Sequence, residues 1–87
     1  MNRLEELPNI GPYLAARLVE IDITTPAALR ELGAVEAYTR LKFRFSKAIT
    51  LHALWAMDAA LSGIDWRHLP DTRKQALKAR LTGHQGE

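Results

Sequence analysis

The side chains of this 87-residue chain that could perform chemistry are few and widely spaced. The three histidines, His52, His68 and His84, are sixteen residues apart, and no two have the i, i+4 spacing that places metal ligands on one helix face. The chain has no cysteine, which excludes a thiolate metal site and a disulfide. We therefore expect no metal site, and we expect His52 to be half-buried and hydrogen-bonded.

Asp58 is the carboxylate with the most unusual surroundings, because it lies between apolar residues such as Trp55 and Leu61. A carboxylate in an apolar helix can act as an acid or base when its pKa is shifted. No second carboxylate lies at helical spacing, so the more common role is an ion pair with an arginine of a neighbouring helix. The sequence has no nucleophile elbow, P-loop or dinucleotide motif, and it predicts no catalytic residue, no cofactor and no small-molecule substrate.

The segment from Leu4 to Leu18 resembles a helix-hairpin-helix, a motif whose loop can bind phosphate. In such a loop, backbone N–H groups point outward at the start of a helix, where the helix dipole is positive. The side chain of Ile10 should point inward and join the two helices. The candidate phosphate-binding residues of this element are Ile10, Gly11, Tyr13 and Arg17.

Several residues of this hairpin differ from the DNA-binding form of the motif. Asn9 replaces a glycine, although asparagine tolerates the left-handed φ that the loop needs. Tyr13 stands where that form tends to carry a lysine, and the acidic residues Glu5 and Glu6 precede the loop. The alternative is that the hairpin is only a compact joint between helices.

A second candidate nucleic-acid site is a basic stretch interleaved with Phe43 and Phe45. Its cations are Arg40, Lys42, Arg44 and Lys47. Such cations can contact phosphates while an exposed aromatic ring stacks on a base. In the alternative, both phenylalanines are buried and the cations are solvated. The last predicted helix adds Arg73, Lys74, Lys78 and Arg80. If these cations share a face with the hairpin loop, DNA binding is favoured; opposite faces favour a protein-binding hairpin.

The charge is distributed unevenly along the chain. Residues 1–36 carry three basic and six acidic residues, a net charge of −3, whereas residues 37–87 carry nine basic and four acidic residues, a net charge of +5. The acidic first half suits protein contacts better than DNA. No signal peptide or stretch long enough to span a bilayer is visible, so we expect a cytoplasmic protein with no membrane contact.

The elements that must position these residues are all predicted to be helical, apart from Lys42–Phe45, which could be a short strand or an extended loop. We expect a compact all-α bundle of about five short helices around a central apolar helix at about 47–62, which Ser46 caps. Other predicted helices start at Pro12, with Val19 on the apolar face, at Pro26 and at Ala34, the last of these ending near Leu41. A final helix should run from Asp71 or Thr72 to about Leu81. We expect one domain, 1–82, and a flexible tail, 83–87.

The order of these motifs resembles the C-terminal domain of the TfoX family, from about Leu4 to Leu81. The resemblance rests on Leu7-Pro8-Asn9-Ile10-Gly11-Pro12, Ile23-Thr24-Thr25-Pro26 with Leu29, Leu32-Gly33-Ala34-Val35-Glu36-Ala37-Tyr38, Leu51-Leu54-Ala60-Leu61-Gly63, and Trp66-Leu69-Pro70 before Lys74. It implies a small, SAM-like helical domain that starts with a helix-hairpin-helix. Full-length members of the family are bacterial regulators of DNA transformation competence with a separate N-terminal domain, so this chain looks like a stand-alone version.

Two functional hypotheses follow from the residues and the resemblance. In the first, the chain is a non-enzymatic regulatory or adaptor domain that binds a protein partner or a second copy of itself through the hairpin helices. In the second, the hairpin loop and the basic patch bind DNA directly and without sequence specificity.

Overall fold

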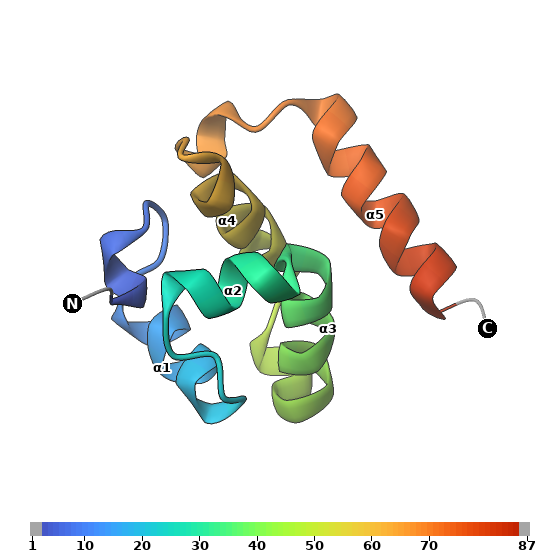
Figure 1. Cartoon of the computed structure of the whole chain (residues 1–87). Helices are drawn as coiled ribbons and strands as arrows, with labels where there is room; N and C mark the ends of the chain where they lie inside the picture. The colour runs from blue at the N-terminus through green and yellow to red at the C-terminus, as the bar shows by residue number, and fades with distance from the viewer. Residues whose placement is uncertain (1–2, 86–87) are drawn as a thin grey trace.

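The computed structural model describes the backbone of residues 3–85 and the side chains of residues 3–81. Within that part of the chain, every regular element is helical, which confirms the predicted all-α fold (Figure 1). The elements are η1 (Leu4–Glu6), α1 (Pro12–Glu20), α2 (Pro26–Leu32), α3 (Ala34–Phe45), η2 (Ser46–Ala48), α4 (Leu51–Ser62), η3 (Trp66–His68) and α5 (Asp71–Gln85), where η denotes a 3-10 turn.

The helix ends follow the signals in the sequence. Pro12 and Pro26 occupy first-turn positions, where the missing N–H of proline has no intrahelical partner to lose. The hydroxyl of Thr25 caps α2 by accepting a hydrogen bond from the N–H of Ala28 at 3.1 Å. Gly33 separates α2 from α3 with a φ of 90°, and Gly63 ends α4 with a φ of 74°. Both glycines occupy positive-φ conformations that other residues adopt at a cost.

Helix α4 is the centre of the core, as its apolar circumference predicts. Leu54, Met57 and Ala59 of α4 are completely buried. The core leucines of the surrounding helices are also buried, namely Leu18, Leu29, Leu41 and Leu77. Removing one such leucine side chain typically destabilises a domain by about 2–5 kcal/mol, so the fold depends on these contacts.

The predicted start of the central helix is wrong by four residues. Helix α4 begins at Leu51, with Thr50 rather than Ser46 at the N-cap position. Ser46 instead takes a positive φ of 53° and starts the separate turn η2. Between η2 and α4, Ile49 is extended and its side chain is buried. The chain leaves the helical path here because this kink brings Ile49 into the core.

The segment Lys42–Phe45 is neither a strand nor a loop, because it forms the last turn of α3. Leu41 and Phe45 are four residues apart and lie on the inner side of this helix, where Leu41 is fully buried and Phe45 packs against the core. Phe43 is 93% exposed, so the alternative in which both phenylalanines are buried fails for one of them. Its position two residues from Leu41 places it on the opposite side of the helix.

One further boundary differs from the predictions. Helix α5 continues to Gln85, so residues 83–85, predicted to be part of a tail, are helical, whereas residues 86–87 lie outside the described residues. A glycine such as Gly83 costs a helix only about 1 kcal/mol and need not end it. At the other end of the chain, the first helix of the hairpin is a single 3-10 turn, η1, which agrees with the one short turn of helix expected at residues 3–7.

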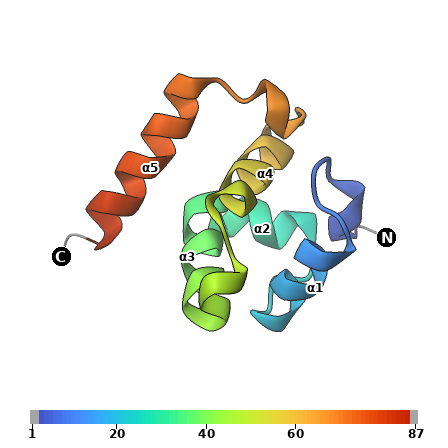
Figure 2. The ribbon, with the colours of Figure 1, turned by 180° about the vertical axis from the view of Figure 1, so that it is seen from behind.

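The arrangement of the helices separates the two ends of the chain. The hairpin and α1 lie on one side of the molecule and α5 lies on the opposite side, with α2, α3 and α4 between them (Figures 1 and 2). Helix α5 packs on α3 and buries Leu77. In the part of the chain that the structure describes, no helix has the length and apolar character needed to cross a membrane.

Candidate functional site

The hairpin loop is held in place by the side chain of Asn9. Asn9 adopts a left-handed φ of 71°, as its residue type allows. Its Nδ2 donates a hydrogen bond to the carbonyl of Ile64 at 2.8 Å and makes a longer contact of 3.5 Å with the carbonyl of Ala56. Its Oδ1 accepts a hydrogen bond from the N–H of Trp66 at 3.0 Å. Asn9 therefore joins the loop to the end of α4 and the start of η3, a role that glycine could not perform.

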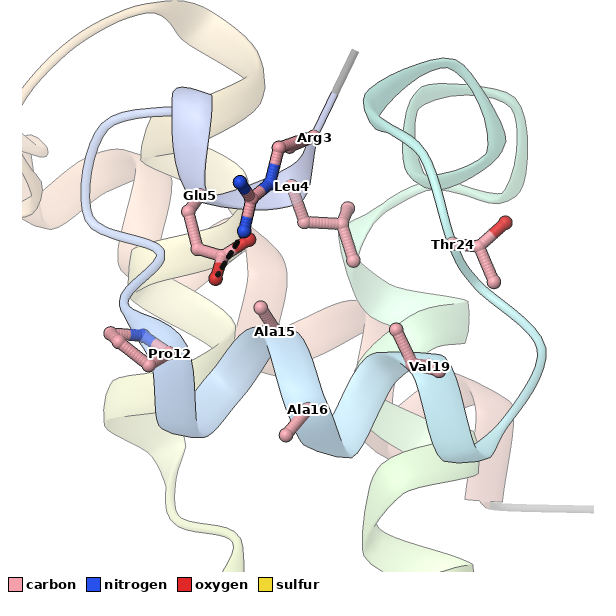
Figure 3. Close-up of a pocket in the computed structure, with 8 residues that line it drawn as sticks. All are labelled: Arg3, Leu4, Glu5, Pro12, Ala15, Ala16, Val19 and Thr24. Carbon is pink, nitrogen blue, oxygen red and sulfur yellow. Dashed lines mark ion pairs between the residues drawn. The ribbon is translucent and has the colours of Figure 1, made fainter. Parts of the chain in front are cut away.

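The other loop residues show how far a phosphate site is formed. The side chain of Ile10 is buried, as predicted, but its backbone N–H donates to the carbonyl of Leu7 at 3.4 Å and is turned into the loop. Helix α1 has neither a side-chain cap nor an acidic residue in its first turn, so its positive pole is not neutralised locally. Glu5, however, lies beside Pro12 at this end of α1 (Figure 3).

Arg17 is held against its own protein. Its guanidinium donates to the carboxylate of Glu20 at 2.7 Å and lies over the rings of Tyr13 and Phe45, at 5.2 and 5.0 Å from their centroids. The Nε atom of Arg17 is buried and has no hydrogen-bond partner among the described residues. Glu20 also pairs with Arg44 at 3.6 Å, so one carboxylate holds two of the predicted DNA-binding cations.

The remaining predicted cations are only partly available. Arg40 pairs with Glu36 at 3.2 Å, and the Nζ of Lys42 donates to the carbonyl of Ile49 at 2.7 Å. Lys47 is exposed on η2. The structure brings Arg17 and Arg44 together at the end of α1 that is remote from the hairpin loop. The cations of α5 lie across the molecule from that loop (Figures 1 and 2).

Asp58 forms the ion pair that its surroundings predict. Its side chain is 7% exposed, and its two oxygens accept hydrogen bonds from Arg73 at 2.7 and 2.9 Å. This two-bond contact raises the pKa of Arg73 through the hydrogen bonds to Asp58. The pair fixes the start of α5 to α4, which is a structural role.

His52 is exposed rather than half-buried, and its ring meets the ring of Trp66 edge-on with 4.5 Å between centroids. It lies in the first turn of α4, on the side that faces solvent. Among the residues that the structure describes, no three His, Asp or Glu side chains come together as metal ligands. The side chain of His84 lies outside the described residues.

The outer side of α1 is the apolar surface that the residue pattern did not reveal. We define the α1 face as the exposed side chains of Pro12, Tyr13, Ala16 and Val19. Tyr13 is 57% exposed and Val19 is 49% exposed, although the pattern placed Val19 on the buried face. At 100° per residue, Val19 lies at the edge of the buried sector and next to Ala16. A helical-wheel projection of residues 12–20 could therefore have indicated an apolar outer edge.

Two hollows flank the α1 face. The first has a volume of about 310 Å³ and lies between α1 and the residues before it, with Pro12, Ala15, Ala16 and Val19 along one side (Figure 3). Arg3 and Glu5, an ion pair at 3.7 Å, border it. The second hollow, of about 280 Å³, lies between the start of α1 and the segment Ala48–Ala56. The α1 face is thus a ridge with a depression on each side, a shape suited to a protein partner.

Comparison with known proteins places the chain in a family. The model of the TfoX C-terminal domain family matches residues 1–81. The DNA transformation protein TfoX of Haemophilus influenzae is 36% identical over 81 residues, which are 93% of this chain and 37% of that protein. Protein Sxy of Escherichia coli is 39% identical over 75 residues, which are 86% of this chain and 35% of that protein. The chain therefore spans about a third of the curated relatives it matches.

Solved structures agree with this placement. A crystal structure of an uncharacterized protein from Listeria monocytogenes, in a triclinic form, has a TM-score of 0.85 and 34% identity, and the match covers 100% of this chain and 97% of that one. A tetragonal form of a Listeria monocytogenes protein of unknown function has a TM-score of 0.82 and 37% identity over 87% of this chain and 93% of that one. The sequence match and the fold together confirm the predicted resemblance: the chain belongs to the TfoX C-terminal domain family.

Proposed function

We propose that this chain is a non-enzymatic regulatory or adaptor domain that acts through protein contacts, with the α1 face as its contact surface. The family supports the regulatory part, because the relative from Haemophilus influenzae is named a DNA transformation protein. A cytoplasmic location is part of the proposal and agrees with the cysteine-free sequence.

One observation carries the choice of protein over DNA. On α1 the exposed groups other than Glu20 are apolar, whereas four cations predicted for DNA are engaged with carboxylates or a carbonyl of the same chain. Burial of apolar side chains against a partner lowers the free energy, because it removes apolar surface from water. Contiguous exposed apolar patches therefore mark protein interaction sites. A cation that must leave an internal partner contributes less to phosphate affinity, because the loss of the internal contact offsets part of the new one.

The experiment is an affinity capture from a bacterial lysate with three immobilised proteins, the wild type and two variants. Ala16→Glu places a charge in the middle of the α1 face, and Ala79→Glu places the same charge on the exposed side of α5. We expect the wild type and the Ala79→Glu control to retain the same protein, and Ala16→Glu to lose it. Retention of every captured protein by Ala16→Glu would contradict the proposal.

Direct DNA binding remains a second candidate because Phe43 is almost fully exposed beside Lys42 and Arg44. An exposed ring among cations can stack on an unpaired base. This candidate predicts affinity for single-stranded DNA that falls steeply with salt and is lost when Arg40, Lys42 and Arg44 are all changed to glutamate. Fluorescence anisotropy at low salt tests it, and the absence of binding to both single-stranded and duplex DNA eliminates it.

A further inference from the structure

We propose that the partner of the α1 face is a second copy of this chain, paired through antiparallel α1 helices about a twofold axis beside Ala16. This inference rests on the proposed function, because it names the occupant of the same surface. Three properties of α1 support it: the register of its exposed residues, the charges at its two ends and the shape beside it.

The register of α1 is self-complementary. The helix has nine residues, Pro12–Glu20, and Ala16 is the middle one. Pro12 and Val19 lie on one edge of the outer side, and Tyr13 and Glu20 lie on the other, given 100° of rotation per residue. When two such helices run antiparallel about Ala16, Pro12 of one copy meets Val19 of the other, twice. A twofold interface requires this reciprocity, because the same patch must fit itself.

The second edge has complementary charge. Tyr13 of one copy meets Glu20 of the other, at the start of the first copy's α1. That first turn contains no acidic residue and has no side-chain cap, and the nearby Glu5 is paired with Arg3 at 3.7 Å, so the positive pole attracts the carboxylate of the other copy. Glu20 is the last residue of α1, and its exposed carboxylate already pairs with Arg17 and Arg44 of its own copy. The antiparallel arrangement therefore places a negative group at each positive end, and a parallel arrangement would place like ends together.

The centre and the flank allow the helices to approach. Ala16 is the smallest side chain of the α1 face, so the backbones can come close at the axis. Val19 and Pro12 border the hollow of about 310 Å³, which leaves room for side chains of the other copy (Figure 3). Because α1 is short, the buried area is small, and we expect a weak, concentration-dependent dimer.

The test uses heterodimer rescue measured by analytical ultracentrifugation. Val19→Lys and Pro12→Glu each place an unpaired charge in both symmetry-related contacts of a homodimer, and both positions are exposed, so folding should persist and circular dichroism will verify it. In a mixed dimer, one contact is native and the other joins the introduced lysine to the introduced glutamate.

The expected masses follow from the 9.8 kDa chain. The mass of the wild type should rise from that of one chain toward that of two between about 10 μM and about 1 mM. Each variant alone should associate at least about tenfold more weakly. Their equimolar mixture should recover the mixed dimer. A wild type that stays at one chain at the highest concentration, or a mixture no heavier than its components, overturns the inference. If either result occurs while Ala16→Glu still loses a captured protein, the inference of a second copy is wrong and the proposed function stands.

Discussion

The outer sides of α1 and α3 are both exposed to solvent, but they differ in what their side chains leave without a partner. On α1 the exposed residues other than Glu20 are apolar, and Glu20 at its end pairs with Arg17. On α3 most exposed residues are charged, and the arginines Arg40 and Arg44 pair with Glu36 and Glu20. The exposed apolar exception on α3 is Phe43.

The difference shows that a count of charges does not measure the charge available to a ligand. The basic half of the chain suggested a polyanion site, yet Arg40 and Arg44 pair with Glu36 and Glu20, which both belong to the acidic first half. Surface ion pairs contribute little to stability, typically about 0–1 kcal/mol, but they occupy the groups that a phosphate would need. On the apolar side of α1, the internal contact to a charged group is that of Arg17 with the ring of Tyr13.

The largest expected effect comes from removing the support of α1 while leaving α3 intact. Asn9→Ala deletes the contacts to the carbonyl of Ile64 and the N–H of Trp66, and it replaces a residue type that tolerates a left-handed φ with one that does not. We expect a loss of about 3 kcal/mol in the free energy of unfolding, because buried groups lose partners and the backbone is strained. Urea denaturation measures it. Asn9→Gly, which relieves only the strain, should recover about 1 kcal/mol; equal losses would contradict this account.

A somewhat smaller effect should follow from freeing α5 on the other side of α3. Asp58→Ala removes the carboxylate that receives two hydrogen bonds from Arg73. Because Arg73 can turn to solvent, we expect a loss of about 2 kcal/mol in the free energy of unfolding. Amide hydrogen exchange should rise in α5 and stay unchanged in α1. The exposed Glu31→Ala serves as control, and faster exchange in α1 would contradict the separation of the two ends.

A third change tests whether internal pairing limits DNA binding. Glu20→Gln removes the carboxylate shared by Arg17 and Arg44. We expect affinity for a DNA duplex at low salt to rise by a few-fold, while stability changes by less than about 0.5 kcal/mol. Fluorescence anisotropy gives the affinity. An unchanged affinity would show that the ion pairs do not determine the weakness of DNA binding.

The smallest effect is expected at Phe43. Phe43→Ser replaces a ring that is 93% exposed, so the free energy of unfolding should change by less than about 0.5 kcal/mol and the protein captured from a lysate should stay the same. Thermal unfolding and the capture experiment check both statements. A loss of capture equal to that of Ala16→Glu would move the contact surface from α1 to α3.

Much of the fold follows from local signals in the sequence. The prolines at 12 and 26, Thr25, Gly33 and Gly63 define helix ends through backbone rules that need no tertiary information. The left-handed Asn9 was also predictable from its residue type. The later start of α4 was not, because the extended chain at Ile49 depends on a place in the core that only the assembled helices create.

The candidate site was less predictable than the fold. Glu20 and Arg44 are 24 residues apart in sequence, so their ion pair depends on how α1 and α3 pack. The exposure of Tyr13 and Val19 likewise depends on which side of α1 the other helices cover. The pairing of Asp58 was predicted because a carboxylate inside an apolar helix requires a partner wherever the helices lie.

The most direct test of the account is an amide spectrum of the ¹⁵N-labelled chain, recorded at increasing protein concentration and then with a DNA duplex at low salt. The central claim is that the domain associates through the α1 face rather than through the basic end of α3. We predict concentration-dependent shifts confined to residues 12–20 and their contacts, with little response to the duplex. Shifts at residues 40–47 on adding duplex, with residues 12–20 unchanged at every concentration, would contradict the claim.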